Sequence, residues 1–101
     1  MDAVDYTFLC EVHGSIITAI SMCGSLVTVR LEALAHRASL TCTDAVIFCL
    51  SLDCVSILRL STEDRRVAHV HTLNIHQETL LFLVLAGGAY LTIRAKAIAL
   101  Q

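Results

Sequence analysis

Residues 43–75 run for 33 positions without a glycine or a proline. Within this stretch apolar and polar side chains alternate in short runs, and this period of two is typical of half-buried β-strands. Because the two residues that most often interrupt regular structure are missing, polar side chains must supply the turns. The sequence predicts an antiparallel meander of three strands at 46–52, 55–60 and 67–75, with a bend at Asp53-Cys54 and a charged turn at 61–66.

The first part of the chain predicts one strand followed by one helix. Residues 4–12 alternate between apolar and polar and are expected to form the strand. Ser15 is a suitable helix cap, and apolar residues then recur every three or four positions over 16–38. Residues 25–31 taken alone also fit a strand, so a second strand is an alternative for that part. We assign residues 30–38 to helix.

The last third of the chain predicts a hairpin. Two apolar runs, Leu80 to Ala86 and Ala89 to Ala95, flank Gly87-Gly88, a pair that suits the positive φ angles of a primed hairpin turn. The final segment from Ile93 to Gln101 contains helix-forming residues, but only enough for about two turns. The expected fold is therefore α+β, with an antiparallel sheet of about five to six strands curled around one helix.

The apolar content is high enough that a membrane protein has to be considered. Hydrophobic residues make up 56 % of the chain and the mean hydropathy is +0.75, above the roughly 45 to 50 % of ordinary soluble domains. The longest stretches without charge or histidine, 14–29 and 79–93, are shorter than the roughly 20 residues that a spanning helix needs. A small membrane protein with helices at 14–29, 45–58 and 79–95 is an alternative, but it would place Asp53 inside the bilayer at a high energetic cost.

Charge and cysteine content narrow the class further. A chain of 101 residues fits a single domain. Its net charge of −2 and its dispersed basic residues give no footprint for nucleic acid. The opening MDAVDY carries acids where an export signal carries basic residues, and the five cysteines form no CxxC motif. We therefore expect buried free thiols and a cytoplasmic location.

Histidines and cysteines supply no convincing reactive site. His69 and His71 are expected on one face of a strand, where a metal ion would need His76 or His13 as a third ligand. No carboxylate supports such a site, so we expect no metal and no other cofactor, and a pH-sensitive surface pair instead. Cys10 and His13 would point to opposite faces of a strand, and no catalytic motif is present. We expect no enzyme activity.

Several segments together resemble a known family. They are VDYTFLCEVHG, a helix ending in EALAHRASL, AVIFCLSLDCVSILRL, RRVAHVHTLNI and LLFLVLAGG. In this order they resemble the phosphotyrosine-binding (PTB) domain family, closest to its malcavernin-type variant. Asp53-Cys54-Val55 stands where the family has a glycine-containing bend. The segment as far as Gln101 also lacks the long C-terminal helix that forms one wall of the family's peptide groove, so we expect that groove to be truncated or completed by another chain.

The resemblance implies a function as well as a fold. It implies a PH-like barrel or open sandwich that serves as a non-enzymatic adaptor or scaffold and binds an extended NPxY-like peptide as an added strand at a sheet edge. The positions that match the peptide-binding edge are Leu73, Ile75, His76 and Gln77. The family's phosphate-binding arginines have no clear counterpart. Arg65 and Arg66 lie beside two acidic residues and are expected to form a solvated surface cluster.

A function of another class also fits the sequence. A small β-rich accessory protein could bind lipid, a membrane surface or a partner protein as a dimer. Residues 80–85 are apolar on both strand faces, and burying both faces requires a second layer. We therefore expect a homo-oligomer, such as a homodimer, under either hypothesis.

Overall fold

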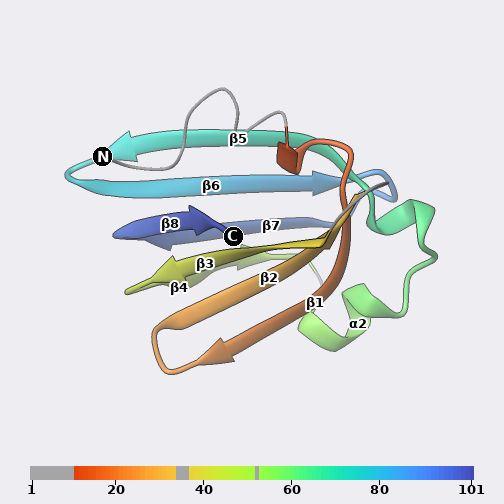
Figure 1. Ribbon diagram of the computed structural model, residues 1–101, viewed down its shortest axis with the longest axis horizontal. Coiled ribbons are helices and arrows are strands. Elements are labelled where there is room, and N and C mark those ends of the chain that lie inside the picture. Colours follow the sequence, from red (N-terminus) through yellow and green to blue (C-terminus); the bar gives the residue numbers. More distant parts are fainter. Residues whose placement is uncertain (1–10, 34–36, 52) are drawn as a thin grey trace.

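The computed structural model describes residues 11–33, 37–51 and 53–101. In this part of the chain there are eight strands, one short α-helix and one 3-10 turn (Figure 1). The elements are β1 (Ile16–Cys23), β2 (Leu26–Glu32), β3 (Arg37–Thr43), β4 (Val46–Leu50), α2 (Cys54–Leu58), η1 (Glu63–Arg65), β5 (Val67–Ile75), β6 (Glu78–Leu85), β7 (Tyr90–Ala95) and β8 (Ala97–Leu100).

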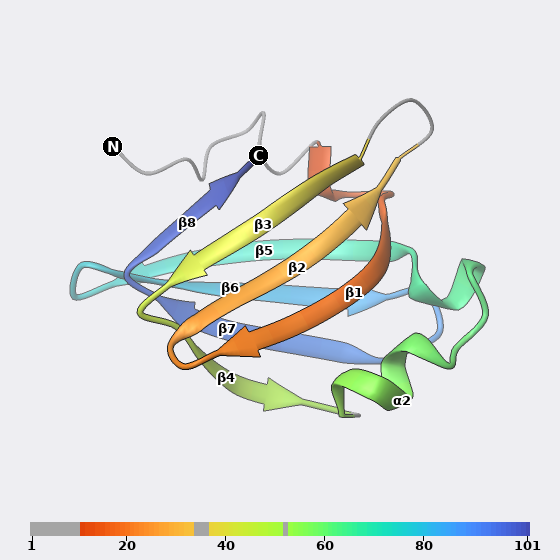
Figure 2. The ribbon, with the colours of Figure 1, turned by 60° about the horizontal axis from the view of Figure 1, so that its bottom comes forward.

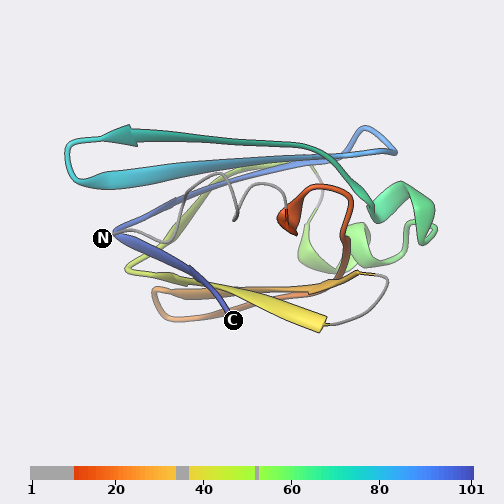
Figure 3. The same ribbon diagram turned by 45° about the horizontal axis from the view of Figure 1, so that its top comes forward.

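The strands form two antiparallel sheets of four that face each other (Figures 1 and 3). Sheet A has the order β1-β2-β3-β8, and sheet B has the order β4-β7-β6-β5. The chain passes from sheet A to sheet B between β3 and β4 and returns between β7 and β8. The amide of Lys96 donates to the carbonyl of Thr43 at 3.0 Å, which holds these two crossings together.

The core lies between the two sheets and is made by every second residue of most strands. Sheet A contributes Val29 and Leu40, and sheet B contributes Leu81, Leu91 and Ile93, all fully or almost fully buried. Burial of each such side chain stabilises the fold by about 1.5 to 3 kcal/mol relative to leaving it exposed. The alternation that predicted strands therefore reflects one face turned to the core.

The β-rich antiparallel character of the fold is confirmed. The strand predicted at 67–75 is β5, with the same bounds, and the hairpin predicted in the last third is formed by β6 and β7. The turn between them is different from the one expected. Of Gly87 and Gly88, Gly88 has a positive φ of 96°, and the amide of Leu85 donates to the carbonyl of Ala89. The link is therefore longer than the predicted two-residue primed turn.

The helix predicted from Ser15 to Ala38 is wrong. Residues 16–32 form the β1–β2 hairpin, and Gly24, at a φ of 60°, lies in its turn. Residues Arg37 and Ala38 begin β3, and residues 34–36 lie outside the described part. The segment is rich in β-branched residues, which favour pleated structure. The expectation of five to six strands around one central helix is replaced by two facing sheets, and the alternative strand at 25–31 corresponds to β2.

The predicted strand at 55–60 is also wrong, because α2 occupies Cys54–Leu58. The Asp53 carboxylate accepts from the amides of Val55 and Ser56 at 2.9 and 2.7 Å, which is the geometry of a helix N-cap. The short helical ending expected after Ile93 is replaced by the end of β7 and by β8.

Other expectations fall at the ends of the described part. The opening strand expected at 4–12 lies mostly outside the described residues, and Glu11 and Val12 belong to a helical turn.

The helices of the membrane alternative are not found in the described residues: 14–29 and 79–95 form hairpins, and 45–58 contains β4 and α2. None of the helices in the described ranges is long and apolar enough to cross a bilayer.

Candidate functional site

Strand β5 forms an edge of sheet B. Eight of its nine residues pair with β6 on one side (Figure 2). On the other side Val67 exchanges backbone hydrogen bonds with Gly14 and Ser15, and from His69 to Ile75 no strand in the described part of the chain pairs with it. An edge strand presents unpaired backbone N–H and C=O groups that can pair with another chain. From His69 to Ile75 this strand carries no Lys, Arg, Asp or Glu, although such charges commonly prevent edge-to-edge pairing.

The other sheet edges have features that limit pairing. Strands β4 and β8 have five and four residues, and β4 contains an irregularity between Ile47 and Cys49. Strand β1 is irregular between Ile17 and Ala19, and α2 packs against it. In addition, Arg65 Nη1 donates to the carbonyl of Ile17 at 3.0 Å. Strand β5 is therefore the longest edge, and its only register shift lies at one end, between Val67 and His69.

The β5–β6 turn determines which backbone groups of β5 face outward. His76 and Gln77 have φ angles of 52° and 66°, which fits a two-residue type I′ turn. The residues that flank such a turn, Ile75 and Glu78, form a hydrogen-bonded pair, and such pairs alternate along an antiparallel ladder. The N–H and C=O groups that point away from β6 therefore belong to Val70, Thr72 and Asn74.

The outer face of sheet B, next to this edge, is unusually apolar. Leu73 is 48 % exposed, Ile75 is 44 % exposed, and both lie opposite outer-face residues of β6. His71 contacts the ring of Phe82 with centroids 6.5 Å apart. We call this surface the apolar face and define it by Val46, Leu73, Ile75, Leu80, Phe82, Val84 and Tyr90. Large exposed apolar surfaces of this kind mark interaction sites in soluble proteins.

A small hollow lies on the apolar face near the β5–β6 turn. Its volume is about 220 Å³, and it is lined by Ile75, His76, Glu78, Leu80 and Arg94. Arg94 Nε and Glu78 Oε2 are 3.5 Å apart and form a partly exposed ion pair. The hollow thus combines aliphatic side chains with a charged rim, which suits one apolar side chain of a bound segment.

The four residues predicted for peptide binding fall into two groups. Leu73 and Ile75 lie on the last part of β5, exposed on the apolar face. His76 and Gln77 form the turn, so their backbone does not continue the edge, although His76 lines the hollow. Sequence reasoning missed the three residues with outward backbone groups, because the outward direction depends on turn type and on which strand neighbours β5.

The histidine pair lies where the sequence placed it. His69 and His71 are both exposed and lie opposite Val84 and Phe82 on the outer face of sheet B. Among the described residues no three His, Cys, Asp or Glu side chains gather closely enough to hold a metal ion. Cys10, the partner considered for His13, lies outside the described residues.

The two adjacent arginines form the expected solvated cluster only in part, because both also bond to the backbone near the start of sheet A. Arg65 is half-buried and donates to Ile17, and its buried Nε has no partner in the described part. Arg66 donates to the carbonyl of Gly14 at 2.7 Å and forms a two-pronged ion pair with Glu63, which raises the arginine pKa and lowers that of the glutamate. The two arginines thus connect η1 and the residue after it to the backbone at the start of sheet A.

Comparison of the chain with protein-family models, with curated proteins and with solved structures finds no match.

Proposed function

We propose that this protein is a non-enzymatic interaction module, an adaptor or scaffold, that binds an extended segment of a partner as an additional strand on β5. The observation that carries the proposal is the β5 edge itself: from His69 to Ile75 the strand has no charged side chain and, in the described part of the chain, no neighbour on its outer side. Strand addition derives affinity from main-chain hydrogen bonds and selectivity from pockets for alternate side chains.

The geometry supports both requirements of this mode. Val70, Thr72 and Asn74 supply outward N–H and C=O groups at every second position, which is the spacing of an antiparallel or parallel partner strand. The apolar face supplies exposed Leu73 and Ile75, together with the 220 Å³ hollow. An NPxY-like peptide, the ligand that the PTB resemblance implies, is the first probe.

The test is a titration of fluorescent NPxY-like peptides against wild-type protein and Thr72→Pro. Proline removes the outward N–H of Thr72, and it is tolerated on an edge strand because the bonds to β6 are untouched. The matched control is Thr72→Val, which keeps the amide and a β-branched shape. We expect saturable binding to wild type and Thr72→Val, and a loss of roughly tenfold or more in Thr72→Pro.

Two results would count against strand addition. One is equal binding by the proline and valine variants while both retain the wild-type circular dichroism spectrum. The other is the absence of saturable binding across a panel of extended peptides.

A second candidate function rests on the apolar face rather than on the edge. Val46, Val84 and Tyr90 extend this face across β4, β6 and β7. A β-rich accessory protein that holds lipid or a second copy of the chain against this face would use the same residues. Native mass spectrometry distinguishes the two: co-purified lipid or a stable dimer that is lost in Val84→Asp, together with peptide binding absent, favours this second function.

A further inference from the structure

The outer face of sheet A has a chemistry opposite to that of sheet B. Its residues alternate with the buried positions Val27, Val29 and Leu31, and many of them are short or hydroxyl-bearing. They include Ala19, Ser21, Thr28, Ser39, Thr41 and Ala99. Arg30 stands among them, directly between Ala19 of β1 and Ser39 of β3. Because both cross-strand neighbours are small, the arginine side chain borders a low region of the surface.

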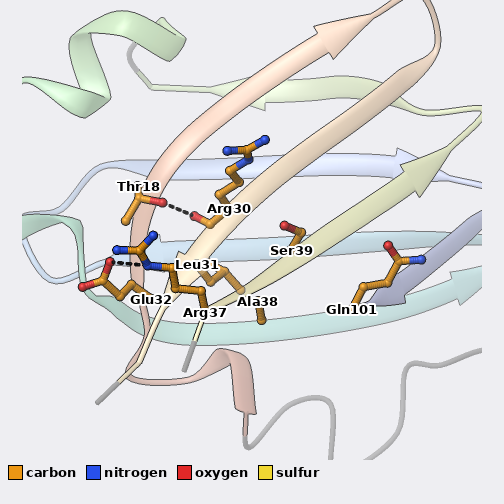
Figure 4. Close-up of a pocket in the computed structure, with 8 residues that line it drawn as sticks. All are labelled: Thr18, Arg30, Leu31, Glu32, Arg37, Ala38, Ser39 and Gln101. Carbon is orange, nitrogen blue, oxygen red and sulfur yellow. Dashed lines mark hydrogen bonds and ion pairs between the residues drawn. The ribbon is translucent and has the colours of Figure 1, made fainter. Parts of the chain in front are cut away.

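This low region is a hollow on the surface of sheet A. Its volume is about 440 Å³, within the range of roughly 300 to 1,000 Å³ of small-molecule sites. Figure 4 shows the side chains around it, which come from β1, β2, β3 and the residue after β8. They are Thr18, Arg30, Leu31, Glu32, Arg37, Ala38, Ser39 and Gln101.

The charges of the hollow leave one arginine without a counter-ion. Glu32 lies 3.6 Å from Arg37 (Oε2 to Nε) at one end of the site (Figure 4). That pair is internally neutral, and Glu32 is the only carboxylate side chain in the lining. The Arg30 guanidinium forms no hydrogen bond or ion pair with any residue in the described ranges, so its positive charge is available to a ligand.

The uncharged polar groups of the hollow add donors. The Ser39 hydroxyl and the Gln101 side chain have no protein partner among the described residues, and Thr18 Oγ1 donates to the carbonyl of Arg30 at 3.3 Å. A guanidinium has five N–H donors and no acceptor, and the hydroxyl and the amide add further donors. A site with several donors around an unpaired guanidinium selects an anion with several acceptor oxygens.

We propose that this hollow binds a phosphate group, either inorganic phosphate or the phosphate of a small monoester, with Arg30 as the principal contact. A phosphate offers acceptor oxygens in several directions, which suits donors from Arg30 on β2 and from Ser39, its cross-strand neighbour on β3, whereas a carboxylate presents its two oxygens in one plane. The site lies on sheet A, away from β5, so it is independent of the strand-addition proposal.

The test is a titration of ¹⁵N-labelled protein with inorganic phosphate at pH 7, against sodium chloride of equal ionic strength. We expect saturable shifts of the Arg30 Nε resonance and of the Ser39 and Gln101 amides. Arg30→Gln should weaken binding by roughly tenfold or more, because it removes a charge-assisted contact. Arg59→Gln is the matched control: it removes the same charge from an exposed arginine at the end of α2 and should leave the affinity unchanged.

Two further ligands separate phosphate recognition from general anion binding. Glycerol 3-phosphate, a small monoester, should bind at least as tightly as inorganic phosphate, and acetate should bind more weakly. The proposal is overturned if acetate binds as tightly as phosphate, if glycerol 3-phosphate binds much more weakly, or if Arg30→Gln and Arg59→Gln reduce binding equally. It is also overturned if phosphate causes no shifts beyond those of chloride.

Discussion

The backbone of Gly87 lies so close to Asp64 that a Cβ on the glycine would stand 2.7 Å from the Cβ of Asp64 and 2.9 Å from its Cγ. The Gly87 amide also donates to the Asp64 carbonyl at 3.1 Å. This contact fixes η1 against the β6–β7 turn, at the end of the sandwich opposite the β5–β6 turn (Figure 1). Glycine is required here by space, since its φ is not positive.

Gly87→Ala should therefore lower the free energy of unfolding by about 1 to 3 kcal/mol, the usual cost of overpacking. Urea denaturation of the variant and of wild type measures this difference in the free energy of unfolding. Asp64→Gly removes the obstructing Cβ, so adding Gly87→Ala to that variant should cost much less than in wild type. Equal costs in the two backgrounds would show that the steric contact is not the cause.

Helix α2 should be held mainly by Ile57, with Leu58 partly buried against the core. Ile57 is 0 % exposed and belongs to the core, whereas Val55 on the same helix is 61 % exposed. Ile57→Ala should cost about 2 to 5 kcal/mol of unfolding free energy, and Val55→Ala less than about 0.5 kcal/mol. Similar losses for the two variants in urea denaturation would mean that α2 does not dock through Ile57.

Arg65 should stabilise the junction between η1 and β1. It is half-buried and donates to the carbonyl of Ile17. Arg65→Ala should cost about 1 to 3 kcal/mol, because it leaves a buried acceptor without its donor. Arg37→Ala, at a side chain that is 87 % exposed, should change stability by less than about 0.5 kcal/mol. A neutral Arg65→Ala in thermal and urea denaturation would contradict this structural role.

The Asp53 cap should make stability depend on acid pH. Hydrogen bonds from the Ser56 amide and hydroxyl, and then from the Val55 amide, lower the pKa of the Asp53 carboxyl below its usual value. Because the folded-state pKa is depressed, this stabilisation is complete above the unfolded-state pKa and is lost as pH falls through the folded-state value. Asp53→Asn should therefore be less sensitive than wild type to pH below about 4. Identical acid-denaturation profiles would exclude the cap as a contributor.

Two cysteines should differ in reactivity. Burial raises the pKa of the Cys42 thiol to about 11, whereas Cys23 is exposed in the native fold. At pH 8 an alkylating reagent should modify Cys23 within the time in which Cys42 stays unmodified, as followed by peptide mass spectrometry. Because burial raises the pKa of Cys42, the stability contributed by the buried neutral thiol is complete below the unfolded-state pKa near 9. It is lost as pH rises toward the folded-state pKa of about 11. Equal alkylation in the native protein would contradict the burial of Cys42.

Local patterns were sufficient to predict some elements. The bounds of β5 follow from the alternation between Val67 and Ile75, and the β6–β7 hairpin follows from its paired glycines. The helix predicted for residues 15–38 was wrong because Ile20, Val27 and Leu31 fit both a helical and a strand spacing. The pairing of β2 with β3 favours the strand over the helix in this region, and such pairing is not a local property of the sequence.

The candidate site was predictable only in part. Leu73 and Ile75 were named from the resemblance to the PTB family, but the status of β5 as an edge depends on the order β4-β7-β6-β5. The hollow beside Arg30 was not predicted from the sequence, because Arg30 and Ser39 are nine positions apart and become neighbours only through the β2–β3 register.

Residue-specific hydrogen exchange along β5 tests strand addition most directly. In the free protein the amides of Val70, Thr72 and Asn74 should exchange much faster than those of His71 and Leu73, which face β6. A saturating NPxY-like peptide should then slow exchange at the three outward amides alone. Strand addition on β5 would be contradicted if the three outward amides are already as protected as His71 and Leu73 without peptide, or if bound peptide leaves their exchange unchanged.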